Sequence, residues 1–105
     1  MLSEILIQIV AIATAISVHE FGHAFSAHLL GDDTAKDSGR MTLDPIKHVD
    51  LLGLLSMIFF KIGWAKPVPI NSSNFKNYKI GSILVSLAGP LSNVLMAIIC
   101  IFIMK

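Results

Sequence analysis

The sequence has little charge and almost no cysteine. Only 14% of its 105 residues are charged, and Cys100 is the single cysteine, so an internal disulfide is excluded. Hydrophobic residues make up 54% of the chain, and the mean hydropathy is +0.75. Because a soluble domain of this size needs more polar surface, the composition favours a single membrane domain over residues 1–105.

Clustered positive charge is also missing. The formal net charge is +1, and no group of basic residues is interleaved with aromatic ones, so we expect no nucleic-acid partner. At the N-terminus, residues 1–4 contain one acidic residue, Glu4, and no basic one. The apolar run also continues past Ala11-Ile12-Ala13, a stretch that resembles a cleavage site. These features favour a retained membrane helix over a cleaved signal peptide. The expected location is a membrane, crossed more than once, with the cell membrane as the expected one.

Three apolar segments divide the chain. As helices, residues 5–30 would extend about 39 Å and residues 80–104 about 37 Å, so both can cross a bilayer core of about 30 Å. Residues 51–65 form a shorter segment, either a short or re-entrant membrane helix, which we favour, or a buried soluble helix. The expected fold is therefore an all-α membrane protein with two long transmembrane helices, one short or re-entrant membrane helix, and short extended segments in the connectors.

Glycine and proline indicate where these elements end or change direction. Gly31 predicts the end of the first helix. Gly89-Pro90 predicts a kink or a break in the last one. Pro67 and Pro69 exclude a helix and impose an extended backbone, which either pairs with an extended peptide substrate or acts as a stiff linker. Polar and apolar residues alternate over 40–43, which predicts a short strand.

The strongest chemical signal is His19-Glu20-Phe21-Gly22-His23, at the end of the first long apolar run. Two histidines four residues apart lie on one face of a helix. Two imidazoles placed there can hold one Zn²⁺, and the glutamate between them can act as the general base of a metalloprotease. Chance produces this pattern roughly 0.003 times in a chain of this composition. The other reading is a hydrogen-bonded polar cluster within a membrane helix.

Two further polar residues bear on this motif. His28 lies nine residues after His19, about 180° round the helix, so it should face away from the pair, at the membrane interface. Asn93 lies one turn after Gly89-Pro90, inside the last apolar segment. Because an amide in lipid needs a partner, Asn93 either links two helices or points at the site.

Taken together, these features resemble the site-2 protease family of intramembrane zinc metalloproteases. The likeness extends beyond the five-residue motif and covers nearly the entire chain, with its blocks in the order that the family has them. The blocks are His19 to Ala24, Gly31 to Ala35, Gly39 to Pro45, His48 to Asp50, Gly63 to Asn71 and Ala88 to Asn93.

The resemblance implies a role for each matching residue. His19 and His23 would be zinc ligands, and Glu20 would activate the attacking water. Asn93 would be a catalytic residue near the metal, where it would stabilise the developing oxyanion or hold the substrate. Residues 67–71 would lie on the substrate side. The implied partners are a transmembrane protein substrate and the lipid bilayer, and the implied reaction is peptide hydrolysis within or beside the membrane.

One part of the family pattern is missing from the sequence. A catalytic zinc site needs three protein ligands, and the family takes the third from a Leu-Asp-Gly motif on a later membrane segment. This sequence has no such motif, so it resembles the N-terminal portion of the enzyme without the C-terminal part. Asp44, His48 and Asp50 are the substitutes that the chain itself offers, and a second chain is another source. The alternative to an active enzyme is a catalytically inactive relative that binds transmembrane helices.

Overall fold

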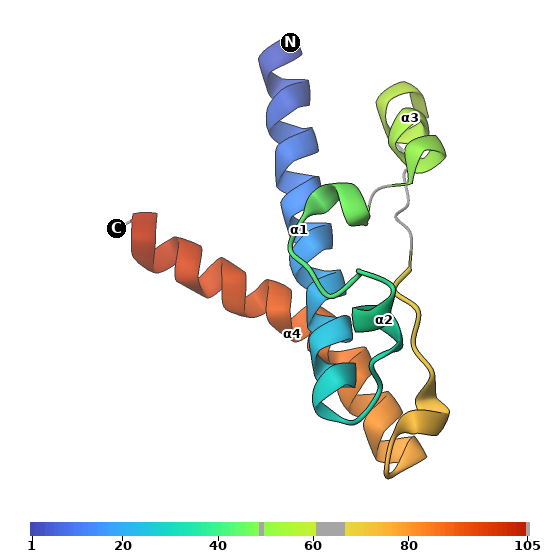
Figure 1. Cartoon of the computed structure of the whole chain (residues 1–105). Coiled ribbons are helices and arrows are strands. Elements are labelled where there is room, and N and C mark those ends of the chain that lie inside the picture. The colour runs from blue at the N-terminus through green and yellow to red at the C-terminus, as the bar shows by residue number, and fades with distance from the viewer. Residues whose placement is uncertain (49, 61–66, 105) are drawn as a thin grey trace.

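Two long helices dominate the structure. The computed structural model describes residues 1–48, 50–60 and 67–104, and these form helices and loops without a β-strand. The long helices α1 (Leu2–Leu29) and α4 (Tyr78–Met104) pack against each other. Helix α4 crosses α1 at the second half of α1 (Figure 1). The short elements between them are α2 (Thr34–Asp37), η1 (Pro45–Lys47), α3 (Leu51–Phe60) and η2 (Ser72–Asn74).

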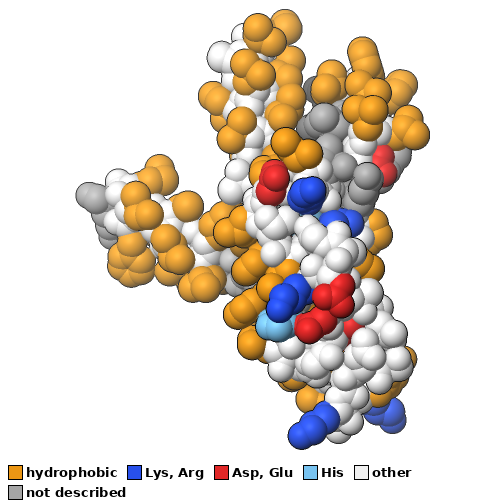
Figure 2. Space-filling model, in the orientation of Figure 1, with side chains coloured by type: hydrophobic (Ala, Val, Ile, Leu, Met, Phe, Trp, Pro, Cys, Tyr) orange, Lys and Arg blue, Asp and Glu red, His pale blue; other side chains and the backbone are white. Residues whose placement is uncertain are grey.

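The prediction of an all-helical chain with two long apolar helices is confirmed. Helices α1 and α4 have 28 and 27 residues, or about 40 Å each, and both are long and apolar enough to cross a membrane. Only 6% of the most apolar stretch of either helix is buried, whereas the core helix of a soluble protein is mostly covered. Figure 2 shows hydrophobic side chains over the free ends of both helices, while the charged ones gather over the connectors and the opposite end.

The third apolar segment is a short helix. Helix α3 has ten residues, about 15 Å, which is half of a bilayer core. The Asp50 carboxylate accepts a hydrogen bond from the Gly53 N–H at 3.1 Å and so caps the start of the helix. The rest of the predicted segment, residues 61–65, lies outside the described residues. A re-entrant path for residues 51–65 stays a prediction.

The end of α1 follows the prediction made for Gly31. This glycine has φ +105°, a left-handed conformation that residues with a Cβ rarely adopt. Its N–H donates to the His28 carbonyl at 3.1 Å, and the next N–H, of Asp32, donates to the Ala27 carbonyl at 2.8 Å. These are the two hydrogen bonds of a Schellman motif, which ends the helix and turns the chain.

The structure differs from two local predictions, one for residues 40–43 and one for Gly89-Pro90. The strand predicted at residues 40–43 is wrong, because Met41 and Thr42 form a bend. The backbone there is satisfied locally: the Arg40 N–H donates to the Ala35 carbonyl at 2.8 Å, and the Thr42 carbonyl accepts from His48 Nε2 at 2.8 Å. Helix α4 continues through Pro90 as one element, so the break predicted at Gly89-Pro90 is absent, and the alternative of a kink stays a prediction.

A close approach of α1 and α4 positions the site. A Cβ added to Gly22 would lie 2.2 Å from Ser92 Oγ and 2.7 Å from the Ala88 carbonyl oxygen. Only a glycine therefore lets the two helices meet at this distance, as is common where small residues line a helix pair. This contact brings the His-Glu-x-x-His turn of α1 beside residues 85–93 of α4.

Candidate metal centre

The two histidines of the motif face each other. Their Nε2 atoms lie 3.0 Å apart, and the rings meet edge to face with centroids 4.6 Å apart. Both side chains are half-buried on the face of α1 that packs against α4. The predicted placement of His19 and His23 on one helix face is what the structure has.

The orientation of His23 is fixed from α4. Its Nδ1 lies 2.6 Å from the Val85 carbonyl oxygen, and a carbonyl only accepts, so Nδ1 carries the proton. Nε2 of the neutral ring therefore presents a lone pair toward His19. A backbone carbonyl that holds the outer nitrogen of a histidine is a common support for a metal ligand.

Gly89 of α4 lies against the facing Nε2 atoms of the pair. A Cβ at this position would be 2.5 Å from His23 Nε2 and 2.7 Å from His19 Nε2. Any side chain at residue 89 would therefore push the two imidazoles apart. The glycine of the Gly89-Pro90 step serves close approach to the histidines, and the sequence had suggested only a role in helix geometry.

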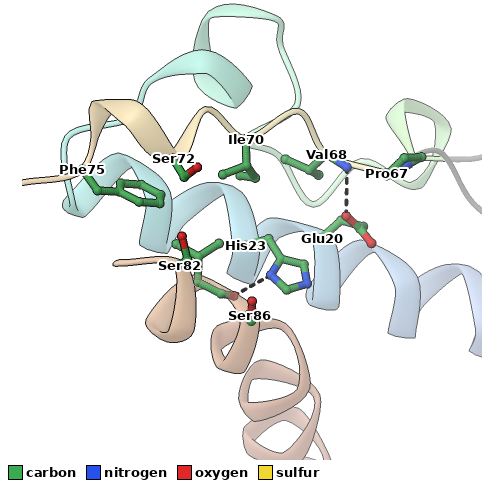
Figure 3. Close-up of a pocket in the computed structure, with 10 residues that line it drawn as sticks. Glu20, His23, Pro67, Val68, Ile70, Ser72, Phe75, Ser82 and Ser86 are labelled. Atoms are coloured by element: carbon green, nitrogen blue, oxygen red, sulfur yellow. Dashed lines mark hydrogen bonds between the residues drawn. The ribbon is translucent and has the colours of Figure 1, made fainter. Parts of the chain in front are cut away.

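Glu20 points toward the loop that precedes α4. Its Oε2 accepts a hydrogen bond from the Val68 N–H at 3.2 Å, as Figure 3 shows. Val68 packs in turn against Ala24 and Ala35, which holds this part of the loop on α1. Between Glu20, His23 and the loop lies a cavity of about 400 Å³, whose lining includes Ile70, Ser72, Phe75 and Ser86.

Asn93 meets His19 from the other helix. Its Nδ2 lies 3.3 Å from His19 Nδ1. The amide therefore links α4 to α1 and also contacts a histidine of the motif, so the two alternatives for Asn93, a helix link or a place at the site, do not exclude each other. Asn93, His19 and Glu20 border a second cavity of about 270 Å³ with Ala15 and Ile16. Asn93 Oδ1 is buried and has no hydrogen-bond partner among the described residues.

The paired nitrogens fit two positions of a zinc site. Tetrahedral zinc with Zn–N bonds of about 2.0–2.1 Å places two ligand nitrogens about 3.3 Å apart, close to the 3.0 Å between the Nε2 atoms. Within residues 1–48, 50–60 and 67–104, however, no group of three or more His, Cys, Asp or Glu side chains could hold a metal ion. The donors described are therefore two of the three that a catalytic zinc needs.

The other candidates for the third ligand are engaged elsewhere. His48 is fully buried, with Nδ1 accepting from Arg40 at 3.2 Å and Nε2 donating to the Thr42 carbonyl. Asp44 caps η1 through the Ile46 N–H, and Asp50 caps α3. His28 bonds to Asp33 at 2.5 Å, away from the pair, as its position on the helix predicts.

A second polar cluster anchors the loop that covers the site. Asp32 is fully buried and accepts from the Asn71 N–H at 2.8 Å, the Asn74 amide at 2.9 Å and Thr34. Burial raises the pKa of the Asp32 carboxyl. The hydrogen bonds from Thr34, Asn74 and Asn71 together lower the pKa by more than burial raises it, so the pKa lies below its usual 3.8. The ionised carboxylate ties the start of the connector after α1 to the loop before α4.

Sequence reasoning missed the backbone groups of the site. The Val68 N–H, the Val85 carbonyl and the space at Gly89 are contributed by the main chain, so no side-chain pattern points to them. The positions of Val68 and Gly89 inside the blocks that carry the family resemblance were the available signal. Asp32 likewise stands in such a block, and its contacts with residues 71–74 depend on how the loop folds back.

Similarity to known proteins agrees with this geometry. The chain is 42% identical to "Putative zinc metalloprotease YwhC" of Bacillus subtilis over 96 residues, which are 91% of this chain and 44% of that protein. It is 34% identical to "Putative zinc metalloprotease Rip2" of Mycolicibacterium smegmatis over 90 residues, 81% of this chain and 34% of that protein. The chain thus spans less than half the length of either relative. No family model and no solved structure matches it.

Proposed function

We propose that this chain carries the His-Glu-x-x-His half of an intramembrane zinc metalloprotease of the site-2 protease family. The observation that carries the proposal is the pair of facing Nε2 atoms, 3.0 Å apart, on a helix long and apolar enough to cross a membrane. Both relatives carry the name "Putative zinc metalloprotease", which supports an enzyme. Nothing in the described residues favours the alternative of an inactive helix-binding relative.

The proposed cofactor is Zn²⁺, held by His19 and His23. Zinc at such a site supplies Lewis-acid polarisation of the scissile carbonyl and a water that ionises near neutral pH. The Val85 carbonyl holds the Nδ1 proton of His23, and this contact would leave the Nε2 lone pair available to the ion. The third ligand comes from outside the described residues, either from a further segment or from a second chain.

Glu20 is the proposed general base. It directly follows His19 and lies three residues before His23 in sequence, and its side chain borders both cavities beside the histidine pair. It would accept a proton from the attacking water and deliver it to the leaving amide nitrogen. The Val68 N–H donates to one oxygen and holds the carboxylate at the edge of the larger cavity.

The proposed substrate is a transmembrane protein segment. A helical substrate must unwind locally, because its carbonyls are otherwise bound within the helix. The 400 Å³ cavity between Glu20, His23 and the loop suits a short stretch of extended peptide. Residues 67–71 belong to no helix, so they are the proposed edge along which that stretch lies.

Glu20→Gln tests this function, with Glu4→Gln as the control on the same helix. Both variants and the wild type are extracted from their own membrane in mild detergent, so that any partner chain is retained, and placed in vesicles with a reporter transmembrane peptide. Cleavage should fall by 10²–10⁴-fold in Glu20→Gln and stay unchanged in Glu4→Gln, with equal zinc content in all three. Wild-type cleavage by Glu20→Gln contradicts the proposal. Zinc-loaded wild type that cleaves nothing supports the inactive relative instead.

A further inference from the structure

A chain of hydrogen bonds crosses α1 and α4, formed by the Val85 carbonyl, the four ring nitrogens of His23 and His19, and the Asn93 amide. The Val85 carbonyl leaves His23 Nδ1 protonated and His23 Nε2 as an acceptor. His19 Nε2, 3.0 Å away, is therefore the donor of that pair. His19 Nδ1 is then the acceptor on its ring, and it receives a hydrogen bond from Asn93 Nδ2 at 3.3 Å.

This arrangement leaves one group unused. Asn93 Oδ1 is buried and finds no hydrogen-bond partner in the part of the chain that the structure describes, which is unfavourable for a carbonyl taken out of water. Buried acceptors normally have a hydrogen-bond partner. We therefore expect Asn93 Oδ1 to accept a hydrogen bond in some other state of the protein. The adjacent group able to become a donor is His19 Nδ1.

Zinc ligation supplies that other state. Both histidines can bind through Nε2 only if His19 Nε2 gives up its proton, and a neutral ring then carries the proton on Nδ1. The Nδ1–H needs an acceptor, and a half-turn of the Asn93 amide exchanges Nδ2 for Oδ1 at this position. The 270 Å³ cavity beside Asn93 and His19 provides room for the turn.

We propose that Asn93 is the positioning residue for the zinc ligand His19. Its Oδ1 accepts from His19 Nδ1–H and so fixes the ring with Nε2 toward the metal, as the Val85 carbonyl does for His23. This inference rests on the proposed function, since it presupposes zinc at the pair. It differs from an oxyanion or substrate contact, in which the amide N–H would be the active group and zinc binding would not depend on residue 93.

Two substitutions separate the acceptor role from the donor role. Asn93→Asp keeps an acceptor and removes the amide donors, whereas Asn93→Leu has a similar volume and removes both. Zinc affinity is measured by competition with a chelating dye, on protein extracted in mild detergent. Asn93→Leu should bind zinc 10–100-fold more weakly, the usual cost of losing such a support, and Asn93→Asp should stay within about threefold of the wild type. Equal affinity of Asn93→Leu and wild type overturns the inference.

The tautomer of His19 gives a readout that a merely structural residue would not change. In zinc-loaded wild type labelled with ¹⁵N-histidine, His19 should show a protonated Nδ1 and a metal-bound Nε2, and Asn93→Asp should show the same pattern. A metal-bound Nδ1 on His19 overturns the inference. Helix content by circular dichroism controls for folding, and Asn93→Ala replaces Asn93→Leu if the larger residue prevents folding. Wild type that binds no zinc refutes the proposed function itself. Wild type and Asn93→Leu that bind zinc equally well refute only the role of Asn93.

Discussion

The backbone N–H of Val68 donates to Oε2 of Glu20 at 3.2 Å, across 48 residues of sequence. The loop before α4 is therefore attached to the residue proposed as the general base. Val68 itself is held by packing on Ala24 and Ala35, so the position of the carboxylate depends on how the loop lies on α1. This contact connects the geometry of the loop to the rate of proton transfer.

Replacing Val68 by proline removes the N–H and keeps an extended backbone between two prolines. A hydrogen bond to a charged group is worth about 1.5–3 kcal/mol, so we expect cleavage to fall by roughly 10–100-fold through kcat. Zinc content should not change, because the histidines are untouched. The control is Ile70→Pro in the same segment, whose N–H is not a donor to Glu20. A wild-type kcat in Val68→Pro would show that this contact does not position the base.

Gly89→Ala tests the close approach of α4 to the Nε2 atoms of the two histidines. The added Cβ would lie within 2.7 Å of both Nε2 atoms, closer than carbon and nitrogen can pack, so the rings must separate. We expect loss of most of the bound zinc, measured by elemental analysis of the purified protein. Leu87→Ala, an exposed position on the same helix, is the control and should keep its zinc. Full zinc content in Gly89→Ala would contradict the arrangement of the pair.

Asp32→Asn tests the anchor of the covering loop. The substitution weakens the hydrogen bonds to Asn71, Asn74 and Thr34, and it should lower the free energy of unfolding by about 1–3 kcal/mol. Asp37→Asn is the control, because Asp37 is an exposed acidic residue in the same connector. Thermal unfolding in detergent measures the effect, and equal stability of Asp32→Asn and wild type would show that the anchor contributes nothing.

The contribution of Asp32 should also depend on pH. Its folded-state pKa lies below the usual 3.8, so the unfolded state binds the proton first as the pH falls. The stabilisation is therefore complete well above pH 3.8 and is lost as the pH drops from about 4 through the lower folded-state pKa. The difference in unfolding temperature between wild type and Asp32→Asn should shrink between pH 5 and pH 3. A constant difference over this range would mean that the carboxylate charge is not what stabilises the loop.

Local patterns were enough to predict much of this fold. The two long apolar runs predicted α1 and α4, and Gly31 predicted the end of α1, because hydropathy and backbone conformation are properties of a few neighbouring residues. The same holds for His19 and His23, whose spacing places them on one face. The strand at residues 40–43 was wrong because alternation alone does not supply a partner strand, and His48 and Ala35 take up the backbone groups instead.

The arrangement between distant segments was not predictable in this way. The contacts of His23 with Val85, of Glu20 with Val68 and of Asp32 with Asn71 join residues 39 to 62 apart. They depend on main-chain groups and on where α4 crosses α1. The family resemblance pointed to Asn93 near the metal, but the orphaned Oδ1 that suggests its specific role appears only in the folded chain.

Zinc stoichiometry tests the central claim most directly. Wild type, His23→Ala and His28→Ala are extracted from their own membranes with partners retained, and metal is counted per chain by mass spectrometry. His28 lies on the same helix but bonds to Asp33, so it is the matched control. The account predicts about one zinc per chain in wild type and His28→Ala, and little or none in His23→Ala. Folded wild type without zinc, or equal zinc in all three proteins, would contradict it.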